Sequence, residues 1–232
     1  MQTNSMTIRT FFSTTLLFII AFSLKAQTIK PAPPEKSDPE AKKVLDRIRK
    51  KYEAYKTIEV GFTLTIEPPE QPKEVLKGTM AQEGSKFRLE MPDQMVVNDS
   101  KTTWVYLKKS NEVQINDSEP SGSEAGFLTP LELIQQYQKG DYLYAITDKI
   151  TEGSRVLTQI EFKPKDKKSE YSKLRVSIDE KAGTIHSLKA IQKDATRYTF
   201  VITKSNPNKA LTGYFTFDPK KYPGVRVEDL RM

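Results

Sequence analysis

The chain has 232 residues, of which 37% are hydrophobic, and a formal net charge of +7. That length allows a sizeable core. It contains no Cys and a single His, which excludes disulfides, thiol nucleophiles, thiolate zinc sites and any site with several His ligands. We expect no cofactor and no bound metal.

The first element in chain order is an apolar run at residues 11–24, preceded by Arg9 and followed by Lys25-Ala26-Gln27. This order is typical of a secretory signal peptide, residues 1–26, cleaved after Ala26. The run is short for a membrane span, which needs about 20 residues. Since Leu24 stands where a small residue is preferred, an uncleaved anchor remains an alternative.

Cleavage would remove two basic residues and leave 35 basic against 30 acidic residues, a surplus of +5. Such a surplus suits an acidic partner or an anionic membrane face, although an ordinary mixed-charge surface also explains it. No aromatic and basic recognition motif is present, so we expect no nucleic-acid partner.

Residues 27–39 are rich in Pro and predict a flexible segment before a domain at 40–232. Asp38 can cap a helix that begins with Pro39. Apolar residues then recur at helical spacing, which predicts an amphipathic helix to about Tyr55.

After Thr57 the apolar residues alternate with polar ones, which indicates half-buried strands joined by short turns. About eleven strands are expected in one antiparallel meander. They are 58–67, 75–82, 86–91, 103–107, 112–116, 142–147, 155–163, 171–179, 184–192, 197–204 and 213–218.

A break in the strands separates the two halves of this series. Residues 117–127 are acidic and contain Gly and Ser, which predicts a mobile loop. Thr129, Pro130 and Glu132 then form a capping-box pattern, and Gly140 can end the short amphipathic helix that follows. Two helices are thus available to cover one face of the sheet. Periodicity does not distinguish a filled core from a cavity beneath them.

Several motifs, taken in order, resemble the periplasmic outer-membrane lipoprotein carrier family (LolA-like). The matching segments are residues 78–91 (GTMAQEGSKFRLEM), 99–106 (DSKTTWVY), 129–134 (TPLELI), 183–186 (GTIH), 214–217 (YFTF) and 223–229 (PGVRVED). Gly84-Ser85 stands where enterobacterial members have an Arg that pins the lid, and this departure predicts a lid that opens more easily.

The resemblance implies a mainly β protein with α-helices. Its fold would be an incomplete antiparallel β-barrel of about eleven strands, covered by two or three lid helices over a hydrophobic cavity. The implied function is a periplasmic carrier, not an enzyme, that shields lipoprotein acyl chains between the inner and outer membranes. Its implied partners are acylated lipoproteins, an inner-membrane ABC transporter complex and an outer-membrane acceptor, and we expect a monomer.

Apolar residues are the candidate acyl-chain ligands, although each could equally be ordinary core. They are Phe62, Leu64, Ile66, Phe87, Leu89, Met91, Trp104, Leu131, Leu133 and Ile134. For Trp104, cross-strand packing beside Tyr106 is a competing interpretation.

Two other functions remain open at this point. The same half-barrel could serve a regulatory protein that senses lipids or lipoproteins. An enzyme acting on lipid or glycan is the second alternative, but no acidic pair among the 30 acidic residues lies in a recognisable catalytic motif.

Overall fold

The computed structural model describes residues 36–118 and 128–231, all within one compact unit. The predicted signal peptide, most of the Pro-rich segment and most of the predicted 117–127 loop lie outside them. No helix among these described residues has both the length and the apolar character needed to cross a membrane.

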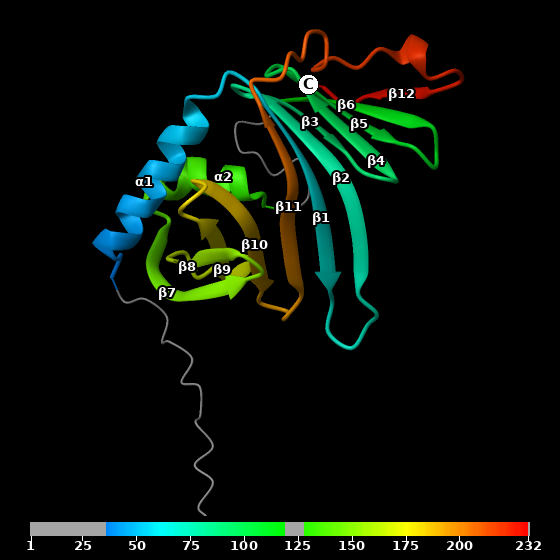
Figure 1. The fold of residues 1–232 in the computed structure, drawn as a ribbon. Helices are drawn as coiled ribbons and strands as arrows, with labels where there is room; N and C mark the ends of the chain where they lie inside the picture. The colour runs from blue at the N-terminus through cyan, green and yellow to red at the C-terminus, as the bar shows by residue number, and fades with distance from the viewer. Residues whose placement is uncertain (1–35, 119–127, 232) are drawn as a thin grey trace, which may run out of the picture. The chain divides into compact units, whose positions relative to one another are not determined.

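One twelve-stranded sheet forms most of the structure (Figure 1). Its strands are β1 (Ile58–Glu67), β2 (Glu74–Glu83), β3 (Lys86–Glu90), β4 (Gln94–Asn98), β5 (Thr102–Leu107), β6 (Glu112–Asp117), β7 (Tyr142–Glu152), β8 (Arg155–Pro164), β9 (Tyr171–Asp179), β10 (Thr184–Gln192), β11 (Arg197–Pro207) and β12 (Arg226–Asp229). The helices are α1 (Pro39–Glu53), α2 (Pro130–Gln136) and the short 3-10 helices η2 (Tyr137–Lys139) and η3 (Pro219–Lys221).

The order of the strands is β12-β6-β5-β4-β3-β2-β1-β11-β10-β9-β8-β7, so β12 and β7 form the two edges. Two antiparallel meanders, β1–β6 and β7–β11, meet where β1 pairs with β11. The sheet is open rather than closed, as the half-barrel prediction requires. It is nevertheless two joined meanders rather than the single expected run, and β12 pairs with β6 in parallel.

Both helices begin as their sequences predict. The Asp38 carboxylate accepts a hydrogen bond from the Glu40 amide at 2.8 Å, and Pro39 occupies the first turn of α1. Thr129 and Glu132 form a reciprocal capping box at the start of α2. Buried apolar residues on α1 and α2 then face the sheet, which orients both helices.

One strand prediction is wrong, and two observed strands, β4 and β12, are missing from the predicted series. Residues 213–218 form turns and irregular chain, because Gly213 has φ +69° and the segment pairs with no described strand. Strand β4 was not predicted because Met95, Val96 and Val97 are consecutive apolar residues. The sheet is covered on both faces at that point, so the strand lacks the alternation of a half-buried one.

The second cover comes from the C-terminal segment. Leu211 and Phe215 pack against Ala81, and Phe217 packs with Tyr106 and Met95. These contacts lie on the outer face of β2–β6, opposite the helices. The 213–218 segment therefore buries its aromatic residues as a strand would, but by covering the sheet instead of joining it.

Candidate functional site

A continuous apolar cluster fills the space between the helices and the concave face of the sheet. We call it the interior cluster. It combines residues from one face of β1–β4 and β7–β11 with eight residues from the helical segments. Those eight are Ala41, Val44, Leu45, Ile48, Leu131, Leu133, Ile134 and Tyr137.

Nine of the ten predicted acyl-chain residues belong to this region. Seven are buried members of the interior cluster: Phe62, Leu64, Leu89, Met91, Leu131, Leu133 and Ile134. Ile66 and Phe87 are half-buried and pack against it. The structure therefore brings together residues of β1, β3 and α2, together with Met91 directly after β3. Whether they bind acyl chains stays a prediction.

Trp104 is the exception. It packs against a separate outer-face cluster of Met95, Val97, Tyr106, Val113 and Phe217. Its assignment to the cavity face is therefore corrected, and the alternative of packing beside Tyr106 is the one that fits. Alternation along β5 is ambiguous because both of its faces are apolar.

Sequence reasoning missed several aromatic members of the interior cluster. The Phe200 ring stacks on Phe62 with centroids 4.4 Å apart, and Tyr144 contacts both Phe162 and Tyr137. The alternation of apolar and polar residues along β7, β8 and β11 could have placed these aromatic residues on the inner face. These residues place a large polarizable surface under both helices.

The interior cluster is closely packed in this structure. Phe62 is 2% exposed, and Leu64, Leu89 and Leu133 are each 1% exposed. The helices thus bury their own apolar faces against the sheet. A guest chain could enter only if at least one helix moved away.

Polar contacts attach α1 to the β9–β10 hairpin. The Arg47 guanidinium pairs with Glu180 at 2.5 Å, and the Lys51 ammonium donates to the Ala182 carbonyl at 2.7 Å. The Tyr52 hydroxyl accepts a hydrogen bond from the Ile185 amide at 3.2 Å. These contacts run along the helix, so α1 is anchored to the sheet.

Asp46 joins α1 to η2, the 3-10 helix that directly follows α2. Its carboxylate accepts hydrogen bonds from the Tyr137 hydroxyl and from Gln138 Nε2, the latter at 2.8 Å, and pairs with Lys42 at 2.6 Å. Hydrogen bonds from Lys42 and then Tyr137 lower the pKa of Asp46 to about 2. Burial, followed by the bond to Asp46, raises the pKa of Tyr137 to about 12.

This lowered pKa gives a pH-dependent prediction. A carboxyl whose folded pKa lies below its usual value of 3.8 stabilises the fold above that pH, and the benefit is lost as the pH falls toward about 2. We expect Asp46→Asn to lower the free energy of unfolding at pH 6, because the variant loses the charge interaction with Lys42. The expected loss is only about 1 kcal/mol, since solvent screens part of that interaction. The difference should shrink between about pH 4 and pH 2, as measured by urea unfolding.

Glu40→Gln provides the control for this experiment. Glu40 lies on the same helix and pairs with Lys43, but both side chains are mostly exposed. Its effect should be smaller at every pH. An Asp46→Asn difference that is constant from pH 6 to pH 2 would contradict the assignment.

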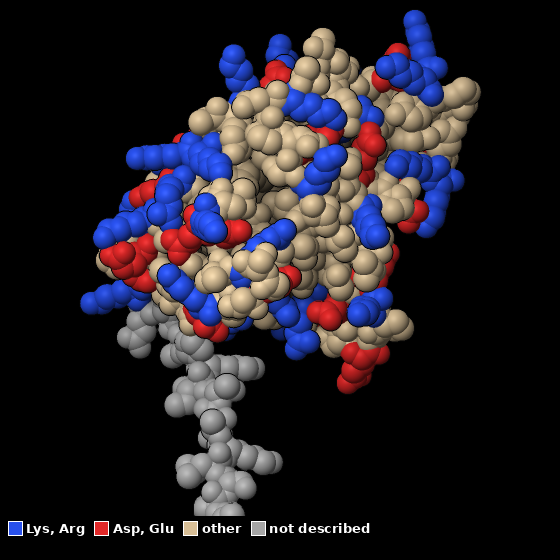
Figure 2. Space-filling view, in the orientation of Figure 1, with Lys and Arg blue, Asp and Glu red and all other residues tan. Residues whose placement is uncertain are grey.

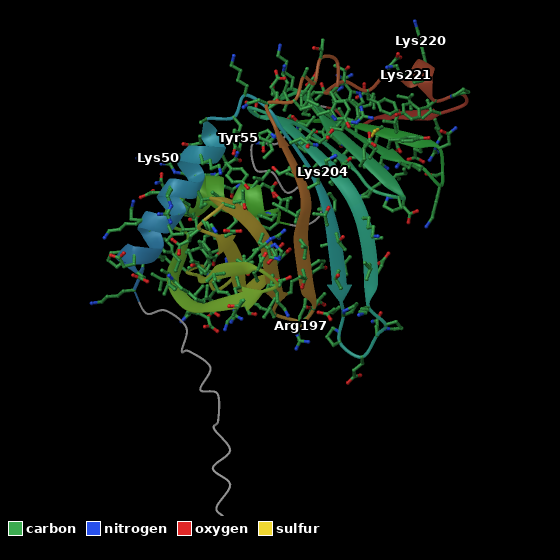
Figure 3. The ribbon with its side chains drawn as sticks, in the orientation of Figure 1. Lys50, Tyr55, Arg197, Lys204, Lys220 and Lys221 are labelled. Atoms are coloured by element: carbon green, nitrogen blue, oxygen red, sulfur yellow. The ribbon has the colours of Figure 1, made fainter. Side chains whose placement is uncertain are left out.

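A pocket of about 200 Å³ lies where the helices meet the turn between β2 and β3. It is lined by Tyr52 and Tyr55 of the α1 end, Leu131 and Gln135 of α2, and Gly84. Figure 3 shows Tyr55 at that end of α1. Gly84 has φ +59°, and a Cβ placed there would meet nothing within 4 Å. Gly84 therefore borders open space where the helices meet the β2–β3 turn.

The described part of the chain offers little for metal chemistry. No group of three or more His, Asp or Glu side chains that could hold a metal ion occurs within residues 36–118 and 128–231. What the geometry provides is an apolar interior beneath two helices. An open curved sheet with helices closing one apolar face defines a half-barrel with lid helices.

Comparison with known proteins identifies the family. Residues 53–218, well over half of the chain, match the family described as outer membrane lipoprotein carrier protein LolA. The protein therefore belongs to the LolA family. The match ends before residues 223–229, so that part of the resemblance lies beyond it.

Several solved structures are similar to this chain at low sequence identity. A conserved protein from Thermus thermophilus is 9% identical, with 82% of this chain and 99% of that chain covered and a TM-score of 0.54. A LolA superfamily protein from Nitrosomonas europaea is 10% identical, with 77% and 98% covered and a TM-score of 0.42. LprF from Mycobacterium bovis is 11% identical, with 76% and 97% covered and a TM-score of 0.44. No curated protein sequence matches the chain.

Proposed function

We propose that this protein is a periplasmic carrier that holds lipoprotein acyl chains between its helices and the concave face of the sheet. It would receive acylated lipoproteins from an inner-membrane ABC transporter complex and deliver them to an outer-membrane acceptor. Residues 1–26 would direct export and be removed after Ala26, leaving a tether at 27–39 and a carrier domain at 40–232. The observation that carries this proposal is the interior cluster, which the sheet and two helices share.

The energetics favour a closed empty state. Burying each methylene contributes about 0.8 kcal/mol, so a 16-carbon chain represents about 12 kcal/mol. Two or three chains would exceed the practical ceiling of about 18–21 kcal/mol for non-covalent binding. A carrier with an empty open cavity would hold its cargo too tightly to release it.

The free energy that opposes acyl binding comes from the helices, which bury their own apolar residues in the empty state. Leu131, Leu133 and Ile134 must leave the sheet before cargo enters, and their exposure to water offsets much of the gain from acyl burial. Cargo and helices thus compete for one surface. A modest difference in affinity at the acceptor is then enough to drive transfer.

Phe87→Asp tests the binding surface. Phe87 is half-buried at the border of the interior cluster, so the variant should fold, unlike a charge at fully buried Leu89. A carboxylate against an acyl chain should weaken binding of a diacylated peptide at least about tenfold. Native mass spectrometry of the protein with the peptide measures both occupancy and stoichiometry.

Trp104→Asp is the matched control, because it places the same charge at a half-buried aromatic position on the opposite face. Its folded fraction should bind the peptide normally. The cavity assignment fails if Trp104→Asp loses binding and Phe87→Asp keeps it.

Transfer between membranes separates the carrier from the alternatives. The wild-type protein should release lipoprotein from donor vesicles bearing the transporter and deposit it in vesicles bearing an acceptor. A sensor would bind the lipoprotein without depositing it, and an enzyme would return a chemically altered cargo.

A further inference from the structure

A second pocket, of about 960 Å³, lies at the end of the sheet where α1 leads into β1. Its walls are the α1–β1 connection, the β2–β3 and β4–β5 turns and the segment that follows β11. Figure 2 shows lysine and arginine side chains projecting along the upper edge of the molecule, above the ends of α1 and β1. The volume lies at the upper end of the range for ligand pockets.

Hydrogen bonds fix one wall of this pocket. The Thr57 hydroxyl donates to the Lys209 carbonyl at 2.6 Å, and the backbone N–H of Asn208 donates to the Thr57 carbonyl at 2.7 Å. The Lys56 amide donates to Asn208 Oδ1 at 3.0 Å. Because these bonds join the α1–β1 connection to the end of β11, the wall is formed before any ligand arrives.

The lining is basic. Lys56, Lys86, Lys101 and Lys209 contribute four ammonium groups, against two carboxylates from Glu83 and Asp99. The Asp99 carboxylate accepts hydrogen bonds from the backbone N–H groups of Lys101 and Thr102 at 2.9 and 2.8 Å, which hold the β4–β5 turn. Its charge remains, so the lining carries four positive charges against two negative ones.

Two of the lysines have their charge unmatched. Lys209 pairs with Glu59 at 2.6 Å, and Lys86 approaches Glu83 at 3.9 Å. Lys56 and Lys101 are exposed, and neither forms an ion pair with any residue that the structure describes. An anionic ligand could therefore gain two charge contacts without displacing an existing pair.

This pocket, which we call the lysine pocket after Lys56, Lys86, Lys101 and Lys209, adjoins the border of the lid helices. Lys56 and Thr57 line both this pocket and the smaller one that contains Leu131 of α2. A molecule whose acyl chains lay beneath the helices, and which left at this border, would pass its polar part directly into the lysine pocket.

We propose that the lysine pocket binds an acidic stretch of the polypeptide that follows the acylated residue of the cargo. This inference rests on the proposed carrier function, since it places the peptide beside the acyl chains. The pocket would make acidic cargo bind more tightly, and electrostatic attraction would also speed its capture. Selection among cargo proteins would then reside outside the apolar interior, which cannot distinguish one acyl chain from another.

An extended peptide suits this lining better than a single compact anion. Ser100 and Thr212 add hydroxyl groups to the lining beside the lysines. The ammonium groups also come from four different segments of the chain instead of converging from one loop. A phosphate-bearing lipid headgroup is the competing ligand, and extraction of phosphatidylglycerol from vesicles by the wild-type protein and the lysine variant tests it separately.

The test compares two diacylated cysteine peptides, one continuing with four Glu and the other with four Gln, by titration calorimetry at low and high salt. The wild-type protein should bind the Glu peptide about three- to thirtyfold more tightly, corresponding to two charge contacts. The Lys56→Gln/Lys101→Gln double variant should lose this preference while binding the Gln peptide normally. High salt should reduce the preference in the wild-type protein.

Lys220→Gln/Lys221→Gln is the matched control. These exposed lysines lie on η3, which Figure 3 places far from Tyr55, and neither lines the pocket. The control removes the same net charge and should keep the preference for the Glu peptide.

The other outcomes contradict either this inference alone or the carrier function as well. Equal binding of both peptides to the wild-type protein overturns this inference and leaves the carrier function standing. Failure of both peptides to bind overturns the carrier function and the inference with it. If only extraction of phosphatidylglycerol from vesicles depends on Lys56 and Lys101, the pocket binds a lipid headgroup and the peptide assignment is wrong.

Discussion

Shortening Leu133 to alanine is expected to destabilise the empty protein and, at the same time, to tighten its binding of acyl chains. Leu133 is 1% exposed and belongs to the interior cluster from the side of α2. Its truncation should lower the free energy of unfolding by about 2–4 kcal/mol, as for other buried leucines. If binding requires α2 to leave the sheet, a weaker closed state raises the apparent affinity, by about tenfold for each 1.4 kcal/mol of that loss.

Met95→Ala is the matched control for this pair of opposite effects. Met95 is 2% exposed in the outer-face cluster, where no lid helix lies. A similar loss of stability is expected, with unchanged acyl affinity. Urea unfolding and native mass spectrometry of the same samples give both quantities. Equal affinity of wild-type protein and Leu133→Ala would show that α2 does not compete with the ligand.

Gly78→Ala is expected to have the second large effect. A Cβ at this position would lie 2.5 Å from the Glu90 carbonyl oxygen and 2.5 Å from Cζ of Phe62. Phe62 stands opposite Gly78 in the β1–β2 pairing, so its ring covers the glycine. The backbone cannot yield easily, and we expect a loss of about 2–3 kcal/mol in the free energy of unfolding.

Gly61→Ala provides the comparison within the same sheet. Its Cβ would lie 3.2 Å from the Thr203 hydroxyl, and a side chain can adjust. A loss below about 1 kcal/mol in urea unfolding is expected for this variant. If the two glycines tolerate alanine equally, the close approach of Phe62 to β2 is not what requires Gly78.

Gly78 also shows what a sequence motif can and cannot reveal. It opens the first segment that resembles the family, yet alternation along the strand gives no reason for a glycine there. The reason is a contact between neighbouring strands, with Phe62 over the glycine and Phe200 stacked on Phe62. Such a contact depends on register, which a single strand's sequence does not specify.

Most elements could be predicted because their patterns are local. The caps at Asp38 and Thr129 and the alternation in β1 and β3 each depend on a few neighbouring residues. The face of Phe87, Leu89 and Met91 followed directly from that alternation and is confirmed by their shared cluster.

The failures arise where a distant segment decides the outcome. Met95 to Val97 and Trp104 lie in strands whose outer face is covered by the C-terminal segment, more than 110 residues further along the chain. Both faces are then apolar, so neither the strand β4 nor the direction of Trp104 could be inferred. Packing of the interior, which places the two helices on the sheet, likewise depends on all the strands together.

The position of α2 in the strand order has a further consequence. It lies on the connection between β6 and β7. Strand β7 forms one edge of the open sheet, and β6 is next to the opposite edge strand, β12. The helix is therefore covalently held on both sides of the face that it covers. When displaced, it remains at the high effective concentration of an intramolecular competitor. Under the proposed carrier function, departing cargo would be replaced at once by a segment that cannot diffuse away, and the protein would reset itself without a second protein to close it.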